Sequence, residues 1–500
     1  MNTAILFDTM SIQQYVFGSN KLRDNLGASY IVEHIYDYLK AKARANPTEL
    51  DVGYIGGGNA LFFTLSEVKA TEIVKEYTSW LLYTYPGVSV AVAIDGKFSK
   101  TDSDYKKKLN DLFSELNANK GKYIPINIIP SHGITATCQF SSLSVEVIER
   151  NPDNSYDQIS SLIASKRLNE ADARKEEKLL LNNDILKEYK FPDKLDDLGQ
   201  RKGEDSHIAV VHIDGNGFGN IFRELNSVEA TINLSNQVKE AVREAFIYSL
   251  SEFVIAKEKN PFLFEGYFYI DKILPIRPIV LGGDDVTFVC HGKLGIWFAE
   301  KFMESFKSNY IDKDNQIPFS SCAGVAIVKT KYPFYRAYQL AEELCNSAKS
   351  ARKKYMDDKK LKDGGNWIDF QLAYSGLGNS LEEVRKLQFV DVKGIKSLHN
   401  RPYCLEKMAD QISIEELKAY TSTLKVTLPN SKIKDLREML TRDNDSQKVF
   451  IEHLKHQHNE EKGFNESFCE NPSPEVILNT YPFFDMIELL ELYPVNLLNE

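Results

Sequence analysis

Apolar and polar positions in the second half of the chain alternate between the two-residue repeat of strands and the 3.6-residue repeat of helices. This pattern predicts, in chain order, a strand at 207–214, a helix at 228–257, a hairpin of strands at 277–281 and 286–290, a helix at 294–309, a strand at 319–329 and a helix at 333–355. That order of elements predicts a ferredoxin-like sheet with helices on one face.

The first half of the chain repeats the same pattern. It predicts a strand at 3–9, a helix at 22–43, a hairpin at 52–65, a helix at 67–85 and a strand at 87–95. Superimposing the two halves places Asp8 opposite Asp214, and GGGN at 56–59 opposite GGDD at 282–285. We therefore predict an α+β protein with two ferredoxin-like units, the first of which has lost its hairpin acids.

The remaining segments are polar or helical. The charged stretch at 160–189 is typical of a solvated linker helix, and the tail beyond Gly376 is predicted to be helical. Within that tail, Ser413 and Glu416 have the spacing of a capping box. The predicted domains are a first unit at 1–130, a linker with a helical insert at 131–205, a second unit at 206–375 and a helical C-terminal domain at 376–500.

Composition narrows the class of protein. The chain has 500 residues, enough for two to four domains, and its net charge of −10 argues against a generally basic nucleic-acid binder while leaving room for a local basic channel. It contains no run of about 18 apolar residues and no signal-like N-terminus, so we expect no membrane span and a cytoplasmic location. Its six cysteines stand singly, which favours reduced thiols over a structural zinc site.

Three acids suggest the chemistry. Asp214 ends a predicted strand, and Asp284 and Asp285 occupy the tip of a predicted hairpin beside it. Each motif alone is as consistent with an ordinary turn, but carboxylates crowded at one edge of a sheet repel one another. Two Mg²⁺ (or Mn²⁺) ions remove that repulsion and prefer carboxylate and phosphate oxygens. The pattern therefore favours a two-metal nucleotidyltransferase with Asp214, Asp284 and Asp285 as catalytic and metal-ligating residues.

Neighbouring residues fit a triphosphate. Glycines let the backbone approach phosphates closely, and a helix beginning after them would offer free N–H groups to an anion. A lysine on the last helix of the unit would reach the same phosphates. The predicted nucleotide-binding residues here are Gly215, Asn216, Gly217, Phe218, Gly219, Gly282, Gly283 and Lys349, with Arg352 and Lys353 as weaker candidates. A dinucleotide-binding fold is rejected, because the glycine spacing and the later acid that it needs are missing.

Taken together, these motifs resemble a known family. The two units with GGGN and GGDD, the stretch SIQQYVFGSNKLRDNLGAS at 11–29 and the stretch GVAIVKTKYPFYRAYQLAEELCNSAK at 324–349 are similar to the large polymerase/cyclase subunit of type III CRISPR effector complexes. The resemblance covers roughly residues 1–375. It implies two palm domains that face each other, bind two nucleotides and make a cyclic oligoadenylate from ATP in antiviral defence, with release of pyrophosphate.

The resemblance also implies roles and partners. Asp214, Asp284 and Asp285 would hold metal, Gly282 and Gly283 would form the turn, and Lys349 would bind phosphate. Gly56, Gly57, Gly58 and Asn59 would line the second nucleotide site. Guide or target RNA and other effector subunits would be partners, and a stand-alone form could be a homodimer.

The chain departs from the family in three places. It begins directly on a palm strand and contains no His-Asp dipeptide, so we expect a form without the histidine–aspartate nuclease domain. Cys138 stands alone where a zinc knuckle is expected. Asn216 stands where the family often has an acid, and its missing charge would alter metal affinity or substrate choice.

Other functions stay open. The palms could serve as a non-catalytic scaffold of an RNA-guided complex, or transfer AMP to another small molecule such as S-adenosylmethionine. A diguanylate cyclase ranks lower because Asp285 and Val286 replace its usual Glu-Phe pair. A template-copying DNA polymerase ranks lower because the chain is acidic. Base preference, ring size, linkage, activating signal and oligomeric state are not determined by the sequence.

Overall fold

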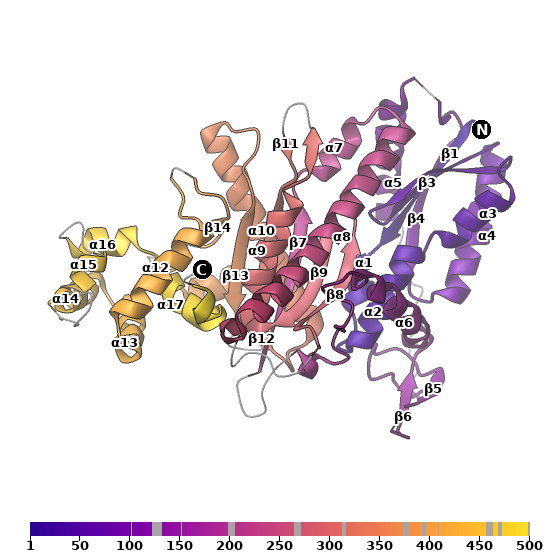
Figure 1. Cartoon of the computed structure of the whole chain (residues 1–500). Helices are drawn as coiled ribbons and strands as arrows, with labels where there is room; N and C mark the ends of the chain where they lie inside the picture. The colour runs from indigo at the N-terminus through magenta and orange to yellow at the C-terminus, as the bar shows by residue number, and fades with distance from the viewer. Residues whose placement is uncertain are drawn as a thin grey trace.

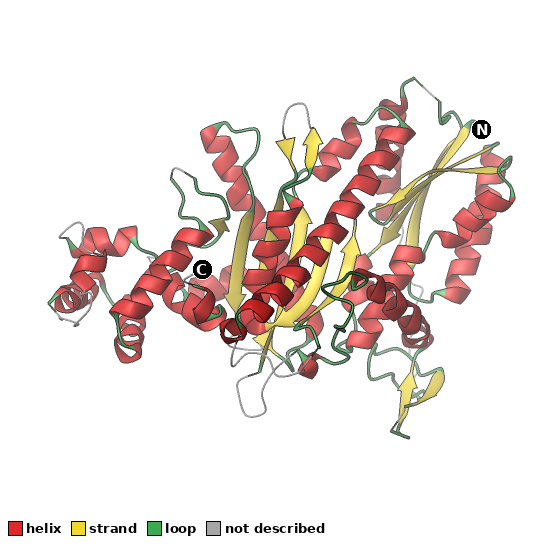
Figure 2. Ribbon diagram, in the orientation of Figure 1, coloured by secondary structure: helices red, strands yellow, loops and turns green. Residues whose placement is uncertain are grey.

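Two β-sheets with covering helices, followed by a helical C-terminal region, make up the protein (Figures 1 and 2). The computed structural model describes residues 1–101, 103–122, 133–151, 153–198, 206–264, 272–312, 317–373, 380–392, 397–408, 410–456, 464–468 and 473–498. The predicted α+β fold class is confirmed by this architecture.

The first sheet is antiparallel and has the strand order β2-β3-β1-β4. Its strands are β1 (Thr3–Met10), β2 (Leu50–Gly56), β3 (Asn59–Thr64) and β4 (Ser89–Asp95), and its helices are α1 (Ile12–Phe17), α2 (Leu22–His34), α3 (Asp37–Ala45), α4 (Glu67–Thr84) and α5 (Tyr105–Lys122). The order is that of the predicted ferredoxin-like unit. The helix predicted at 22–43 is two helices, because the chain turns at the fully buried Ile35 and Tyr36.

The second sheet has the order β14-β13-β12-β7-β9-β8, and its last four strands repeat the topology of the first sheet. Its strands are β7 (His207–Gly215), β8 (Ile276–Gly282), β9 (Asp285–His291), β12 (Ser321–Lys329), β13 (Trp367–Leu372) and β14 (Tyr403–Cys404). Its helices are α7 (Phe218–Glu224), α8 (Val228–Lys259), α9 (Gly295–Phe306) and α10 (Phe334–Lys359), and a short hairpin is formed by β10 (Tyr310–Asp312) and β11 (Ile317–Pro318). β13 extends the unit by pairing parallel to β12.

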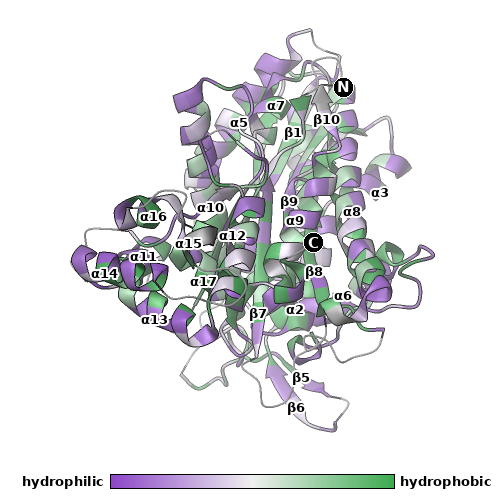
Figure 3. Cartoon of the chain, turned by 60° about the vertical axis from the view of Figure 1, so that its left-hand side comes forward, coloured by the Kyte–Doolittle hydropathy of each residue, from purple (hydrophilic) through white to green (hydrophobic). Residues whose placement is uncertain are grey.

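Helices cover both faces of each sheet, which corrects the prediction of helices on one face. In β1, Ile5 packs with α2 and α4, whereas its neighbour Leu6 packs with α5 on the opposite face. In β7, Val211 faces α8 and α9, and Val210 faces α10. Figure 3 shows the resulting run of hydrophobic strands through the centre of the molecule. Successive apolar residues in a strand require cover on both sides.

The insert between the sheets packs on the first unit. It contains the hairpin β5 (Val147–Arg150) and β6 (Tyr156–Ile159) and the helix α6 (Ser161–Leu180). Arg167 of α6 is 8% exposed, and its Nε donates to the fully buried Asp24 of α2 at 2.9 Å. Gly27 leaves room for the α6 backbone at Lys166. The expectation of a solvated linker helix was therefore wrong: the charges at 166–167 are buried against α1 and α2.

One apolar core joins the two units. Phe17, at the end of α1, stacks on Tyr338 of α10 with ring centroids 3.9 Å apart. The N-terminal part of α8 joins the core of the first sheet through Val228, while the rest of the helix packs in the core of the second. The long helix α8 crosses both units in Figure 1. The two sheets are therefore fixed relative to each other by side chains from each unit.

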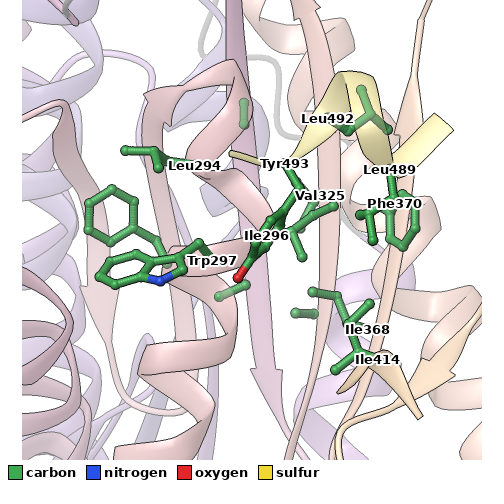
Figure 4. Close-up of a cluster of buried hydrophobic side chains, with 14 of the residues drawn as sticks. Leu294, Ile296, Trp297, Val325, Ile368, Phe370, Ile414, Leu489, Leu492 and Tyr493 are labelled. Atoms are coloured by element: carbon green, nitrogen blue, oxygen red, sulfur yellow. The ribbon is translucent and has the colours of Figure 1, made fainter. Parts of the chain in front are cut away.

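The C-terminal region is helical, as predicted. It contains α11 (Leu381–Gln388), α12 (Ile414–Thr427), α13 (Asn430–Leu440), α14 (Asn444–Lys455), α15 (Phe464–Phe468), α16 (Pro474–Thr480) and α17 (Phe483–Leu492). The capping box of Ser413 and Glu416 is present at the start of α12. Figure 4 shows Leu489 and Leu492 of α17 beside Phe370 of β13. In the part of the chain that the structure describes, no helix is long and apolar enough to cross a membrane.

Candidate nucleotide and metal site

The two glycine-rich hairpin turns lie opposite each other. A methyl group on Gly283 would stand 3.7 Å from the Cα of Gly57. A cavity of about 700 Å³ lies against both turns, and it is lined by the residues 56–59 and 282–285 together with α1, α2, α3 and α8. The internal repeat therefore builds one shared cavity, and of its two hairpin turns only the one from the second unit carries acids.

The turn conformations explain two of the glycines. Gly283 has φ of +59°, and Gly58 has φ of +78° with the Cδ1 of Ile12 2.7 Å from where its Cβ would lie. Any other residue is strained at such angles. The Tyr36 hydroxyl donates to the Gly58 carbonyl oxygen at 3.0 Å, and the Thr9 amide donates to the same oxygen at 2.9 Å. The turn of the first unit is thus braced although it carries no acid.

The three predicted acids come from neighbouring strands. Asp214 of β7 and Asp285 of β9 are register partners, and the Gly215 amide donates to the Asp284 carbonyl oxygen at 3.0 Å. Burial, together with the charge of Asp214, raises the pKa of Asp284 to about 6 and that of Asp285 to about 7. The acids therefore disfavour one another's ionised form in the absence of a cation.

Lys349 forms an ion pair with Asp214 rather than facing a free pocket. The first unit repeats this arrangement, because Lys120 of α5 forms an ion pair with Asp8 of β1. In each unit the strand-end acid is thus neutralised by a lysine from the helix that follows the fourth strand. Arg352, a weaker phosphate candidate, donates instead to Asp363 at 2.6 Å and to the Gly365 carbonyl oxygen.

The donor set suits a hard divalent cation. Asp284 and Asp285 line the cavity, and Asp285 Oδ1 is buried without a hydrogen-bond partner in the described chain. Such an orphaned oxygen is what a metal ion or an ordered water satisfies. With Asp214 next to them these residues offer only carboxylate oxygens, which fit Mg²⁺ or Mn²⁺. No choice of one oxygen from each of the three carboxylates brings all three oxygens within 4.8 Å of one another, however.

Other predicted residues lie away from the cavity wall. Phe218 is buried, with its ring edge-on to Phe319 at 5.0 Å, so only its backbone remains for a nucleotide. Asn216 is buried beside Ser320, whose carbonyl oxygen accepts from its backbone amide at 2.8 Å. Gly217 has φ of +77° and begins the short helix α7, while nothing surrounds Gly219 closely enough to require a glycine.

Several residues of the site were not predicted from the sequence. Lys40, Arg44 and Lys239 line the cavity, on helices whose pattern contains no motif. Lys40 is paired with Asp37, and Lys239 is paired with Glu33. His212 lies beside Asp285, and Glu342 of α10 is close enough to raise the pKa of Asp285 further, after burial and Asp214. His212 stands two residues before Asp214 on the same face of β7, so strand alternation was a usable signal for it.

A second cluster lies between α2 and α6. Among the described residues, Glu33, His34 and Glu176 alone form a group of three potential ligands within 4.8 Å of one another. His34 Nδ1 lies 2.7 Å from Asp37 Oδ2, and its Nε2 lies 2.9 Å from Glu176 Oε1. Burial lowers the pKa of His34, but both carboxylates outweigh it, so the pKa is raised overall. The arrangement is that of an imidazolium that ties the two helices together.

We expect this tie to depend on pH. Because the pKa of His34 is raised on folding, its contribution is present below about pH 6.5 and is lost as the pH rises through the folded-state pKa. His34→Gln should lower the free energy of unfolding by about 0.5–1 kcal/mol at pH 5.5, and by less at pH 9. Urea denaturation at both pH values measures this. His456→Gln, at the exposed end of α14, is the control, and an equal loss at both pH values would contradict the assignment.

A family model described as Cas10/Cmr2, second palm domain, matches residues 207–356. No curated protein sequence matches the chain. Among solved structures, Csm1 in T. onnurineus is similar with a TM-score of 0.57 and 12% identity, over 99% of this chain and 69% of that chain. A Csm1-Csm4 cassette in complex with cA4 is similar with a TM-score of 0.54 and 12% identity, over 98% and 69%. At these identities the likeness shows a common fold.

Proposed function

We propose, from the similarity of residues 207–356 to the second palm domain of Cas10/Cmr2, that the protein is a nucleotidyltransferase that makes a cyclic oligoadenylate-type messenger from ATP in CRISPR antiviral defence. One observation carries the proposal. The turns at 56–59 and 282–285 meet beside one cavity of about 700 Å³ that both of them line, and only the second turn carries acids. Two nucleotides facing one set of carboxylates would give one reacting centre between them.

The proposed reaction joins two nucleotides. The 3′ oxygen of one nucleotide attacks the α-phosphorus of the other, the bond from that phosphorus to the pyrophosphate oxygen breaks, and the hydroxyl proton passes to solvent. Two Mg²⁺ (or Mn²⁺) ions held by Asp214, Asp284 and Asp285 would lower the pKa of the hydroxyl and neutralise the leaving pyrophosphate. The chain itself orients the reactants, with Gly56, Gly57, Gly58 and Asn59 on one side and Gly282 and Gly283 on the other.

The solved relatives support the substrate and the partners proposed here. Csm1-Csm4 cassettes of the same fold have been determined in complex with AMPPNP, with pppApApA and with cA3. We infer that this chain likewise takes ATP, and that it works in the cytoplasm with other type III effector subunits and their guide or target RNA. A homodimer is the alternative if the chain works alone.

The proposal is tested by incubating the purified protein with ATP and Mg²⁺, with and without an activating RNA complex. Mass spectrometry of the products should show cyclic or linear oligoadenylates and pyrophosphate. Adding S-adenosylmethionine to the same mixture tests transfer of AMP to that acceptor. Absence of any ATP-derived product under all these conditions would contradict the proposed activity.

A scaffold role is the second candidate function, and one observation favours it. Asp214 is already neutralised by Lys349, and the three carboxylates are not gathered into one cluster. A scaffold would bind its partner subunits without needing ATP or Mg²⁺. Calorimetry that detects no binding of an ATP analogue with Mg²⁺, in the presence of the effector partners, would support the scaffold.

Lys349 offers a direct test of phosphate binding. In the proposed cycle its ammonium leaves Asp214 for the triphosphate when a cation takes over the carboxylate. Lys349→Met should therefore raise the KM for ATP about 10-fold or more, while Lys349→Arg, which keeps the charge, should lose less. Steady-state kinetics measures both. An unchanged KM in Lys349→Met would show that the lysine serves the fold alone.

A further inference from the structure

A buried histidine lies directly behind the second acid of the GGDD turn. His212 is 4% exposed and stands opposite Thr287 in the β7–β9 register. Its Nδ1 lies 3.3 Å from Asp285 Oδ1 and 3.3 Å from Thr287 Oγ1. The oxygen that it approaches is the buried Asp285 Oδ1 that has no hydrogen-bond partner in the described chain.

Neighbouring aromatic rings hold the imidazole in place. Tyr338 of α10 packs edge-on against His212, with ring centroids 5.5 Å apart and an interplanar angle of 77°. Tyr338 is itself 1% exposed and is stacked on Phe17 from the first unit. A ring confined in this way keeps Nδ1 aimed at the same point, so its position is a property of the fold rather than of a mobile side chain.

When Asp285 is ionised, the geometry selects one tautomer. An ionised carboxylate oxygen only accepts hydrogen bonds, so a bare Nδ1 lone pair 3.3 Å from Asp285 Oδ1 would be repelled. A proton on Nδ1 turns the same contact into a donor–acceptor pair, which a small rotation of either side chain aligns. The Thr287 hydroxyl can accept from the same N–H or donate elsewhere, so it does not oppose this tautomer.

We propose that His212, as its Nδ1–H tautomer, is the positioning residue that holds Asp285 Oδ1, and so leaves the other carboxylate oxygen for a divalent cation. This inference rests on the proposed function, because it assigns a partner to one of the proposed metal ligands. Ligating carboxylates are commonly held by such a second hydrogen bond, and loss of that bond weakens metal affinity about 10- to 100-fold. His212 touches neither substrate nor cation and acts only through Asp285.

Mn²⁺ binding to the metal-free protein tests the inference without relying on turnover. His212→Leu removes the donor and should weaken Mn²⁺ affinity about 10- to 100-fold at an unchanged melting temperature. His212→Asn places an amide nitrogen near the position of Nδ1 and should remain within about 3-fold of the parent. Every titration, followed by electron paramagnetic resonance, uses the His34→Gln background, so that the cluster between α2 and α6 does not contribute.

The outcomes separate the inference from the proposed function. If the parent protein binds no Mn²⁺, the proposed metal site is wrong. If the parent binds and His212→Leu binds equally well, the metal site stands and the role of His212 is overturned. Nitrogen-15 NMR of the histidines in the unmutated, metal-free protein at pH 9, where Asp285 is ionised, decides the matter even if a variant does not fold. The proposal requires the Nδ1–H tautomer at His212, and an Nε2–H tautomer contradicts it.

Discussion

The Asp284→Asn/Asp285→Asn protein is expected to form product at least about 10³-fold more slowly than the wild type, because two of the three oxygen ligands for the cations become neutral amides. The same change should leave the metal-free protein no less stable. Burial and the charge of Asp214 raise the pKa of both acids, so their ionisation is unfavourable in the fold. With the partly exposed carboxylates screened by solvent, the gain in unfolding free energy at pH 8 should be about 1 kcal/mol.

A matched control is an acid of the first unit that lines the same cavity. Asp51 also lines the cavity, but its carboxylate pairs with Lys100 at 2.9 Å. Asp51→Asn should keep the rate of product formation within a few-fold of the wild type, since it removes no proposed ligand. Pyrophosphate release and urea denaturation measure both variants. Equal rates in the double variant and the wild type would show that the turn at 282–285 does not carry the chemistry.

The Arg401→Met protein should be destabilised by about 3–5 kcal/mol, the largest effect expected on the fold. Arg401 is buried, with Asp485 at 3.0 Å and Glu488 at 2.6 Å, and it donates to the Phe370 carbonyl oxygen of β13. Without its guanidinium, two buried carboxylates lose the cation that they share in a medium of low dielectric constant. Tyr403 continues to donate to Asp485, but one neutral donor does not replace a full positive charge.

The control for this variant is an arginine with the same partner near the surface. Arg437 lies 3.3 Å from Glu488, but its side chain is 31% exposed. Arg437→Met should therefore lower the free energy of unfolding by about 1 kcal/mol or less. Thermal and urea unfolding measure both variants. Similar losses in the two would mean that burial of Arg401 does not set its contribution.

The sequence predicted the two sheets because their strands and hairpins depend on local alternation. It did not predict cover on both faces, although the unbroken apolar run at 208–211 is typical of a strand buried on two sides. The packing of α6 was missed for another reason. From the sequence alone, a charged residue such as Arg167 is expected to face solvent. Its partner Asp24 is 143 residues away in the chain, and only the fold brings the two side chains together.

The same distinction between local sequence pattern and tertiary arrangement applies to the candidate site. The turns at 56–59 and 282–285 have a sequence signature, and the structure places both on one cavity. No sequence signature marks Lys40, Arg44 and Lys239, because each belongs to a helix and reaches the cavity through the tertiary arrangement alone. The pairing of Lys349 with Asp214 could not be predicted from the sequence either. A lysine is equally suited to bind a phosphate and to pair with a carboxylate, so the residue type does not distinguish the two.

The ring stack of Phe17 on Tyr338 has a consequence for how this duplicated chain can change over time. The turn of the N-terminal half carries no acids, so this half contributes no carboxylate to the turn at 282–285. Yet Phe17 is the neighbour that keeps Tyr338, and through it His212, in a fixed orientation. The first unit, whose turn carries no acids, therefore still sets the shape of the second unit, and deleting it would remove the contact that orients Tyr338 and His212.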